Sequence, residues 1–320
     1  CNVAVVTNVA ADHIGLGGIN SVSQMAKVKQ VVPETVAKSG YAILNADDDL
    51  VYAMRKDLDC NIALFSMNAE NERIKKHCES GGMACVIENG FVTILKETWK
   101  VRVLPVKDIP VTYGGKALHN IANVLPAVMS TYLFKNITIE DIRQALLTFI
   151  PSATITPGRL NFFQMNNCTF LVDYAHNPHG LELVGQFVSQ LDYPYITGII
   201  TGTGVRGEGV IRALGSNAAR YFNEITIRTD KNLRGRTEAE IVELVRQGVS
   251  DVDAGKKITV IPDEREAIDY AYREAPQSGL VFVMCDEVTG ALEKIKSIKD
   301  EEEKSGGKGK LTDLQTISAK

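Results

Sequence analysis

Residues 170–180 read FLVDYAHNPHG, and they are the most informative stretch of this chain. Its first three residues form an apolar run that predicts a short buried strand, and a helix is expected to begin near Gly180. Asp173, His176 and Asn177 then lie between the strand and the helix, where open α/β sheets bind ligands. Because the first N–H groups of a helix can bind an anion, the stretch indicates a ligand site at the carboxyl end of a strand.

The same residues have a purely structural interpretation, which stays open on spacing alone. Asp173 is then a solvated strand end, Asn177-Pro178 starts a turn, and His176 begins a helix. Short motifs of this kind also occur in proteins that lack the corresponding site. The rest of the chain must therefore decide between the two interpretations.

Strand and helix patterns alternate through the second half of the chain. Predicted strands lie at 170–172, 195–200, 224–227, 258–261 and 280–284. Predicted helices lie at 181–191, 210–221, 238–248, 265–275 and 290–298. This alternation predicts an α/β fold with a largely parallel sheet and helices on both faces.

The first half also begins with alternating strands and helices, but a hairpin or small meander is expected after its third strand. Predicted strands lie at 3–7, 41–44 and 62–65, and a hairpin or small meander is expected at 84–87, 91–95 and 101–104. Predicted helices lie at 22–32, at 118–133 with a kink or interruption at Pro126, and at 140–149. The segment 151–158 reads as a linker. We therefore expect domains at 1–155 and 156–299, followed by a disordered tail at 300–320.

The bulk properties are those of a globular cytoplasmic protein. The chain has 320 residues, which is enough for about two domains. Its net charge of −4 argues against binding to nucleic acid or to an anionic membrane surface. No apolar run is long enough to span a bilayer, and no signal-peptide pattern is present. The six cysteines form no Cys-x-x-Cys pair, so they are expected to be reduced thiols.

Two stretches of the first half carry residues suited to a metal or a phosphate. Asp12 and His13 follow the first predicted strand and are able to hold a divalent cation, although an ordinary polar loop is the alternative. Lys27 and Lys29 lie on the next predicted helix, where a solvated face is the default interpretation.

Two further stretches have a ligand interpretation and a structural one. Residues 114–123 read GGKALHNIAN; the glycines allow a close backbone approach to a ligand, and the alternative role of His119-Asn120 is a helix cap. Residues 228–236 read RTDKNLRGR, which suits an anionic ligand or a carboxylate but also a solvent-facing loop of mixed charge. No G-x-x-x-x-G-K-[ST] sequence occurs, so this chain has no P-loop of its own.

Taken in order, these motifs resemble the Mur ligase superfamily, and within it the C-terminal half of the cyanophycin synthetase family. The resemblance extends to about Lys299. It rests on Thr7-Asn8…Asp12-His13, Tyr41…Asn45-Ala46-Asp47-Asp48, His119-Asn120…Asn123, Pro157-Gly158-Arg159, Asp173-Tyr174-Ala175-His176-Asn177-Pro178 and Asp230-Lys231…Leu233-Arg234-Gly235-Arg236. It implies the remainder of a central nucleotide-binding domain followed by a Rossmann-like domain with a largely parallel sheet.

The resemblance implies an ATP-dependent amide-bond ligase with ATP and Mg²⁺ as cofactors. Arginine would be added to the aspartate side chains of a poly-aspartate backbone through an acyl phosphate. Expected partners are these substrates, the missing upstream portion of the same enzyme and further copies in a homo-oligomer. The alternatives are another Mur-type ligase of the cell-wall or folylpolyglutamate class, and a non-catalytic binding module that retained the fold.

Site residues also follow from the resemblance. His13 resembles a magnesium ligand, and Lys29 matches a position that is carbamylated in several Mur ligases and helps to place a second magnesium, with Lys27 as the alternative. His13, Lys29 and Asp173 are the expected catalytic residues.

The expected nucleotide-binding and substrate-binding residues complete the set. His119 and Asn120 resemble the adenine contact. The remaining nucleotide-binding residues are Arg159, Asp173, His176 and Asn177. Asp230, Arg234 and Arg236 resemble the loop that selects the incoming amino acid.

The resemblance also implies that part of the enzyme is missing. The chain begins at Cys1 and enters a strand pattern without an entry cap, and the family's P-loop should lie just upstream. We therefore expect a fragment that does not turn over ATP alone.

Overall fold

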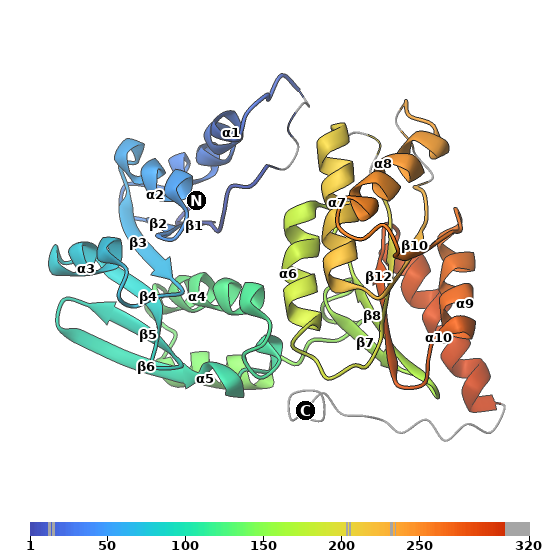
Figure 1. The fold of residues 1–320 in the computed structure, drawn as a ribbon. Coiled ribbons are helices and arrows are strands. Elements are labelled where there is room, and N and C mark those ends of the chain that lie inside the picture. The colour runs from blue at the N-terminus through green and yellow to red at the C-terminus, as the bar shows by residue number, and fades with distance from the viewer. Residues whose placement is uncertain are drawn as a thin grey trace. The chain divides into compact units, whose positions relative to one another are not determined.

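The chain divides into two compact units, Cys1–Ile150 and Pro151–Lys320 (Figure 1). The computed structural model describes residues 1–11, 14, 17–202, 204, 206–230, 233 and 235–304. The division falls at the start of the segment 151–158, whereas the sequence placed the boundary between residues 155 and 156.

The first unit is built on a sheet in which six strands follow one another in sequence order. The strands are β1 (Val3–Val6), β2 (Tyr41–Asn45), β3 (Asn61–Ser66), β4 (Met83–Glu88), β5 (Phe91–Lys96) and β6 (Trp99–Pro105). β1 to β4 are parallel, and β5 and β6 continue the sheet antiparallel. This confirms the predicted meander.

Helices cover both faces of this sheet. They are α1 (Val22–Glu34), α2 (Asp49–Met54), α3 (Glu72–Glu79), α4 (Leu118–Tyr132) and α5 (Ile139–Thr148). Successive strand residues point to opposite faces, so Ala42 and Leu44 pack in the core that α1, α2 and α3 share, whereas Ile43 packs toward α4 and α5. α4 continues through the buried Pro126, so the helix is not interrupted there.

The second unit has a six-stranded sheet of order β11-β10-β9-β12-β8-β7. Its strands are β7 (Asn161–Gln164), β8 (Cys168–Asp173), β9 (Ile196–Ile200), β10 (Glu224–Ile227), β11 (Lys257–Val260) and β12 (Gly279–Met284). Only β7 is antiparallel to its neighbour. The sheet is therefore largely parallel, as predicted.

β12 is inserted between β8 and β9. The chain passes from β8 through α6 (Pro178–Val188), α7 (Glu208–Tyr221) and α8 (Glu238–Ser250) to the far edge of the sheet. It returns through α9 (Glu264–Glu274) and ends in α10 (Val288–Lys304). Because crossovers are right-handed, the reversal puts α9 and α10 on the opposite face from α6 to α8 (Figure 1). The loops after β8 and β12 thus leave toward opposite faces, the arrangement at which open α/β sheets bind ligands at the carboxyl ends of their strands.

The predicted disorder of residues 300–320 is wrong for the first part of that segment. α10 continues to Lys304, and the side chain of Glu302 is buried. Its carboxylate accepts hydrogen bonds from the backbone N–H of Asn166, at 3.0 Å, and from the Tyr272 hydroxyl. These bonds stabilise the last, highly charged turn of α10. Its composition alone had predicted disorder. Residues 305–320 lie outside the described part of the chain.

The structure describes the state of the cysteines and the character of the helices. All six cysteines are free thiols, and four of them are buried. Within the described ranges, no helix combines the length and the apolar character that crossing a bilayer requires.

A glycine in the centre of the second sheet gives a stability prediction. A Cβ atom at Gly198 would overlap the ring of Phe222, which stacks on Phe282 at 5.3 Å between ring centroids. We expect Gly198→Ala to lower the free energy of unfolding by about 1–3 kcal/mol, because the ring must shift within a packed core.

Urea denaturation measures this change, and Gly209→Ala is the matched control. A Cβ atom at Gly209, in the first turn of α7, meets no atom within 4 Å. That variant should therefore leave the urea midpoint unchanged or raise it. Equal midpoints for Gly198→Ala and the wild type would contradict the packing described for β9.

Candidate functional site

Polar residues gather at the carboxyl edge of the second sheet. β8 ends at Asp173, Arg228 follows β10, and Met284-Cys285 closes β12. The backbone N–H of Cys285 donates to the carbonyl of Asp173 at 3.0 Å. The guanidinium of Arg228 donates to the carbonyl of Met284 at 2.9 Å. The inserted strand β12 therefore joins the ends of β8 and β10 into one surface.

The carboxylate of Asp173 is buried behind this edge, with only 6% of the residue exposed. It accepts a hydrogen bond from the backbone N–H of Leu160 at 2.9 Å. Burial raises the pKa of Asp173 to about 6, and the N–H groups of Leu160 and Ala175 together with the charge of Arg159 oppose that rise. The side chain is therefore mostly ionised at neutral pH and faces backbone donors.

Arg159 is the exposed cation beside it. Its guanidinium carbon lies 5.4 Å from the centre of the Tyr174 ring, and the Tyr174 and His176 rings lie 4.6 Å apart. The His176 Nδ1 atom is 2.9 Å from the carbonyl of Tyr174. Arg159, Asp173 and His176, which come from two separate sequence motifs, thus lie near one another on the segments just before β7 and just after β8.

Asn177 has a structural role, but as a helix cap and not as the start of a turn that the alternative interpretation expected. It is the N-cap of α6, and its side-chain oxygen accepts a hydrogen bond from the N–H of Gly180 at 2.7 Å. Pro178 fills the first helical position, where it needs no N–H partner. A cap of this kind also orients the start of α6 toward the carboxyl edge, so it does not exclude a ligand there.

Arg228 is a buried cation with a structural role, although its segment was expected to bind an anionic ligand or to face solvent. It is 2% exposed and pairs with Asp230 at 3.0 Å and with Glu264 at 3.1 Å. Burial raises the pKa of both carboxyl groups, and the charge of Arg228 opposes the rise. The apolar strand directly before Arg228 was the only signal that its side chain could be buried.

The remaining residues of this loop are only partly described. Arg236 donates to the carbonyl of Arg206 at 3.4 Å. Arg234 lies outside the described residues, so its predicted role in selecting an amino acid stays a prediction.

At the carboxyl edge of the first sheet, Lys29 reaches the end of β1. Its ammonium group donates to the carbonyl of Asn8 at 3.0 Å. The same loop is held by Asp48, whose carboxylate accepts the N–H of Val9 at 2.7 Å. His13 lies outside the described residues. Among the residues that are described, no group of three His, Cys, Asp or Glu side chains is arranged to hold a metal ion.

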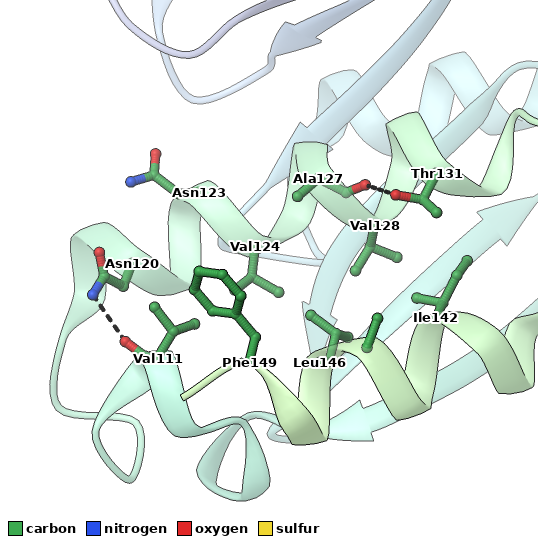
Figure 2. Close-up of a pocket in the computed structure, with 11 residues that line it drawn as sticks. Val111, Asn120, Asn123, Val124, Ala127, Val128, Thr131, Ile142, Leu146 and Phe149 are labelled. Atoms are coloured by element: carbon green, nitrogen blue, oxygen red, sulfur yellow. Dashed lines mark hydrogen bonds between the residues drawn. The ribbon is translucent and has the colours of Figure 1, made fainter. Parts of the chain in front are cut away.

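The other candidate site of the first unit is a pocket of about 340 Å³ between α4 and α5 (Figure 2). Asn120 and Asn123 lie at one end, and the Nδ2 atom of Asn120 donates to the carbonyl of Val111 at 2.8 Å. Burial lowers the pKa of His119 to about 4, so this imidazole is neutral at neutral pH. The rest of the lining is mostly apolar: Val111, Val124, Ala127, Val128, Thr131, Ile142, Ala145, Leu146 and Phe149.

Asn123 was not among the predicted site residues, although its spacing was informative. It follows Asn120 by three positions, and residues three apart share a face of a helix.

Lys29 and Asn120 do not share a face of their sheet, because α1 and α4 pack on opposite sides of it.

Comparison with known families identifies both units. Residues 1–131 match the Mur ligase middle domain, and residues 158–286 match the family described as Mur ligase, glutamate ligase domain. Among solved structures, the folylpolyglutamate synthase of Mycobacterium tuberculosis is similar with a TM-score of 0.64 and 16% identity. That similarity covers 92% of this chain and 64% of the other, and at this identity it shows the fold alone.

Curated relatives give closer matches. The cyanophycin synthetase of Nostoc sp. is 42% identical over 92% of this chain, and that of Synechocystis sp. is 42% identical over 93%. The chain spans about a third of the length of these relatives, 33% and 34%. The UDP-N-acetylmuramate–L-alanine ligase of Acetivibrio thermocellus is 25% identical over 88% of the chain and 56% of its own length. With both domain models in order along the sequence, this chain belongs to the Mur ligase family.

Proposed function

We propose that this chain is the Mur-type ligase part of a cyanophycin synthetase, which adds arginine to the aspartate side chains of a poly-aspartate backbone. The observation that carries the proposal is the 42% identity over 92% of the chain, because it extends over both units. Since the chain spans a third of those relatives, the activity is assigned to the full-length enzyme, with the upstream portion and further copies of the enzyme as partners in the cytoplasm.

The proposed reaction has two steps. The γ-phosphoryl group of ATP passes to an aspartate carboxylate, which gives an acyl phosphate and ADP. The amine of arginine then attacks the acyl carbon, the bond from that carbon to the phosphate oxygen breaks, and the amine loses a proton. The products are an amide and inorganic phosphate.

The pocket beside α4 supports binding of the adenine base. Its walls are mostly apolar, and the Asn120 amide donates one of its N–H bonds to Val111, so that its side-chain oxygen is the proposed acceptor for an amino group. His119, the residue before Asn120 and the other proposed adenine contact, is neutral at neutral pH. The similar synthases of M. tuberculosis and Yersinia pestis were crystallised with ADP and AMPPCP and with AMPPNP and a manganese ion, respectively.

The carboxyl edge of the second sheet supports binding of anionic groups. Arg159 offers an exposed guanidinium, which suits a phosphate because its donors can bind two oxygens at once. His176, Asn177 and Asp173 border the same edge, and Asp230 with Arg236 are the proposed contacts of the incoming amino acid.

Mg²⁺ is the proposed metal cofactor. The residues of the described part do not form a metal donor set, and the proposed ligand His13 lies outside it. Lys29, whether carbamylated or not, is the proposed second member of that site. Because the sequence has no P-loop motif, the chain by itself is proposed not to turn over ATP.

The other Mur-type ligases are weaker candidates. The cell-wall ligases match at 25–26% identity, against 41–43% for the cyanophycin synthetases. A non-catalytic module would bind nucleotide without releasing ADP, so turnover separates it from the proposed function.

The choice of amino acid gives the first prediction. In the full-length enzyme with an aspartate polymer and ATP, we expect arginine to stimulate ADP release, with one ADP and one phosphate per arginine added. D-glutamate, L-alanine, diaminopimelate and folate with glutamate are the matched controls for the other ligases. Stimulation by one of these instead of arginine would refute the assignment.

The adenine contact gives a second prediction. If the Asn120 oxygen accepts from the adenine amino group, the enzyme should prefer ADP over inosine diphosphate, which carries a carbonyl at that position. Asn120→Ala should lower this preference by about fivefold, because a neutral hydrogen bond contributes about 1 kcal/mol.

Titration calorimetry with both nucleotides measures this preference. The substitution also breaks the bond between Asn120 and Val111. Because that change should weaken the binding of both nucleotides equally, it cancels in the ratio of the two affinities. An unchanged ratio in Asn120→Ala would place the adenine elsewhere.

A further inference from the structure

Two loops at the carboxyl edge of the second sheet contact each other backbone to backbone. Gly204 lies in the loop between β9 and α7, and Leu233 lies in the loop between β10 and α8. A Cβ atom at Gly204 would overlap the carbonyl oxygen of Leu233 and lie 2.6 Å from its carbonyl carbon. Only glycine lacks that atom, so the close approach of the two loops depends on a glycine at this position.

Contacts on either side of Gly204 join the same two loops. The carboxylate of Asp230 accepts a hydrogen bond from the side chain of Thr201. The guanidinium of Arg236 donates to the carbonyl of Arg206 at 3.4 Å. The loop after β9 therefore contacts the loop after β10 near its start, in its middle and near its end.

The helices that follow these loops are packed as closely as the loops themselves. A Cβ atom at Gly215 on α7 would overlap the carbonyl oxygen of Val245, and one at Gly248 on α8 would overlap that of Arg212. The hydroxyl of Ser216 also donates to the carbonyl of Gly248 at 2.9 Å. Because the two helix backbones are in contact, a larger residue at the loop contact cannot be accommodated by moving one helix without breaking this packing.

We propose that Gly204 is a positioning residue for the incoming amino acid and that Thr201 supports the same role. By admitting the carbonyl of Leu233, Gly204 fixes the places of Asp230 and Arg236, the two proposed contacts of that amino acid. The role rests on the proposed function, which makes arginine the amino acid that is added.

Steady-state kinetics of the full-length enzyme test this role. In Gly204→Ala, we expect the KM for arginine to rise by about tenfold, because the methyl group must displace Leu233, and a shift of about 1 Å at a substrate-positioning group can cost about 10²-fold. The KM for ATP should stay within about twofold, since Asn120 and Arg159 lie on other segments. An unchanged KM for arginine, or an equal rise for ATP, would overturn the proposal.

Gly207→Ala is the matched control in the same loop. A Cβ atom at Gly207 meets no atom within 4 Å, so this variant should leave the KM for arginine unchanged. A general loss of folded enzyme would lower kcat and leave both KM values as they are, so a rise in the KM for arginine alone separates positioning from destabilisation. An equal rise in Gly207→Ala and Gly204→Ala would overturn the proposal.

Hydrogen exchange tests the loop contact without any substrate. The N–H of Arg236 donates to the carbonyl of Leu233 at 3.1 Å, so its exchange reports on the carbonyl that Gly204 admits. In Gly204→Ala, we expect the peptide that covers residues 229–236 to exchange about tenfold faster, with β9 and β10 still protected. Wild-type exchange of this peptide would overturn the proposal, even if the enzyme adds an amino acid other than arginine.

Thr201→Val covers the case in which Gly204→Ala does not fold. Valine keeps the shape of this buried side chain, which is 4% exposed, and removes the hydroxyl that bonds Asp230. We expect the KM for arginine to rise by about fivefold, because Asp230 loses a hydrogen bond that orients its carboxylate. A folded Thr201→Val enzyme with the wild-type KM for arginine would overturn the proposal.

Discussion

The insertion of β12 between β8 and β9 is the constraint on which the second unit depends. A strand that returns to the middle of a parallel sheet reverses the direction of the crossovers, so its own loop leaves toward the other face. The ends of β8 and β10 both bond the end of β12, through the carbonyl of Asp173 and the guanidinium of Arg228. The site at this edge is therefore a consequence of strand order as much as of sequence motif.

Burying charge at this edge requires dense hydrogen bonding. An isolated buried ion is strongly unfavourable, and pairing together with hydrogen bonds offsets the lost hydration. Arg228 meets that requirement with two carboxylates and a carbonyl, and Asp173 meets it with backbone N–H groups. Both residues are buried beneath this surface, whereas Arg159 is exposed on it.

The fold followed from local patterns wherever an element was long and periodic. The alternation of apolar strands and helices predicted both sheets. β7 was missed because it is four residues long and polar at both ends, and its place is fixed by pairing with β8. α2 and α3 were missed because they are short, although the side-chain caps Asp48 and Asn71 mark where they begin.

The sequence could predict which polar residues gather at the site, but not their burial or backbone conformation. The motif around Asp173 correctly predicted a polar cluster at the end of a strand. It did not reveal that Leu160 is left-handed or that Arg228 is buried, because both depend on contacts between segments distant in sequence. The helical turn at Asp300–Lys304 is a third case, since the bonds of Glu302 reach residues far along the chain.

The structure of the full-length enzyme with a non-hydrolysable ATP analogue tests the central claim most directly. We predict the guanidinium of Arg159 about 3 Å from a phosphate oxygen, with the adenine base in the pocket beside Asn120. A structure in which the base lies elsewhere, or in which no phosphate lies near Arg159, would contradict it.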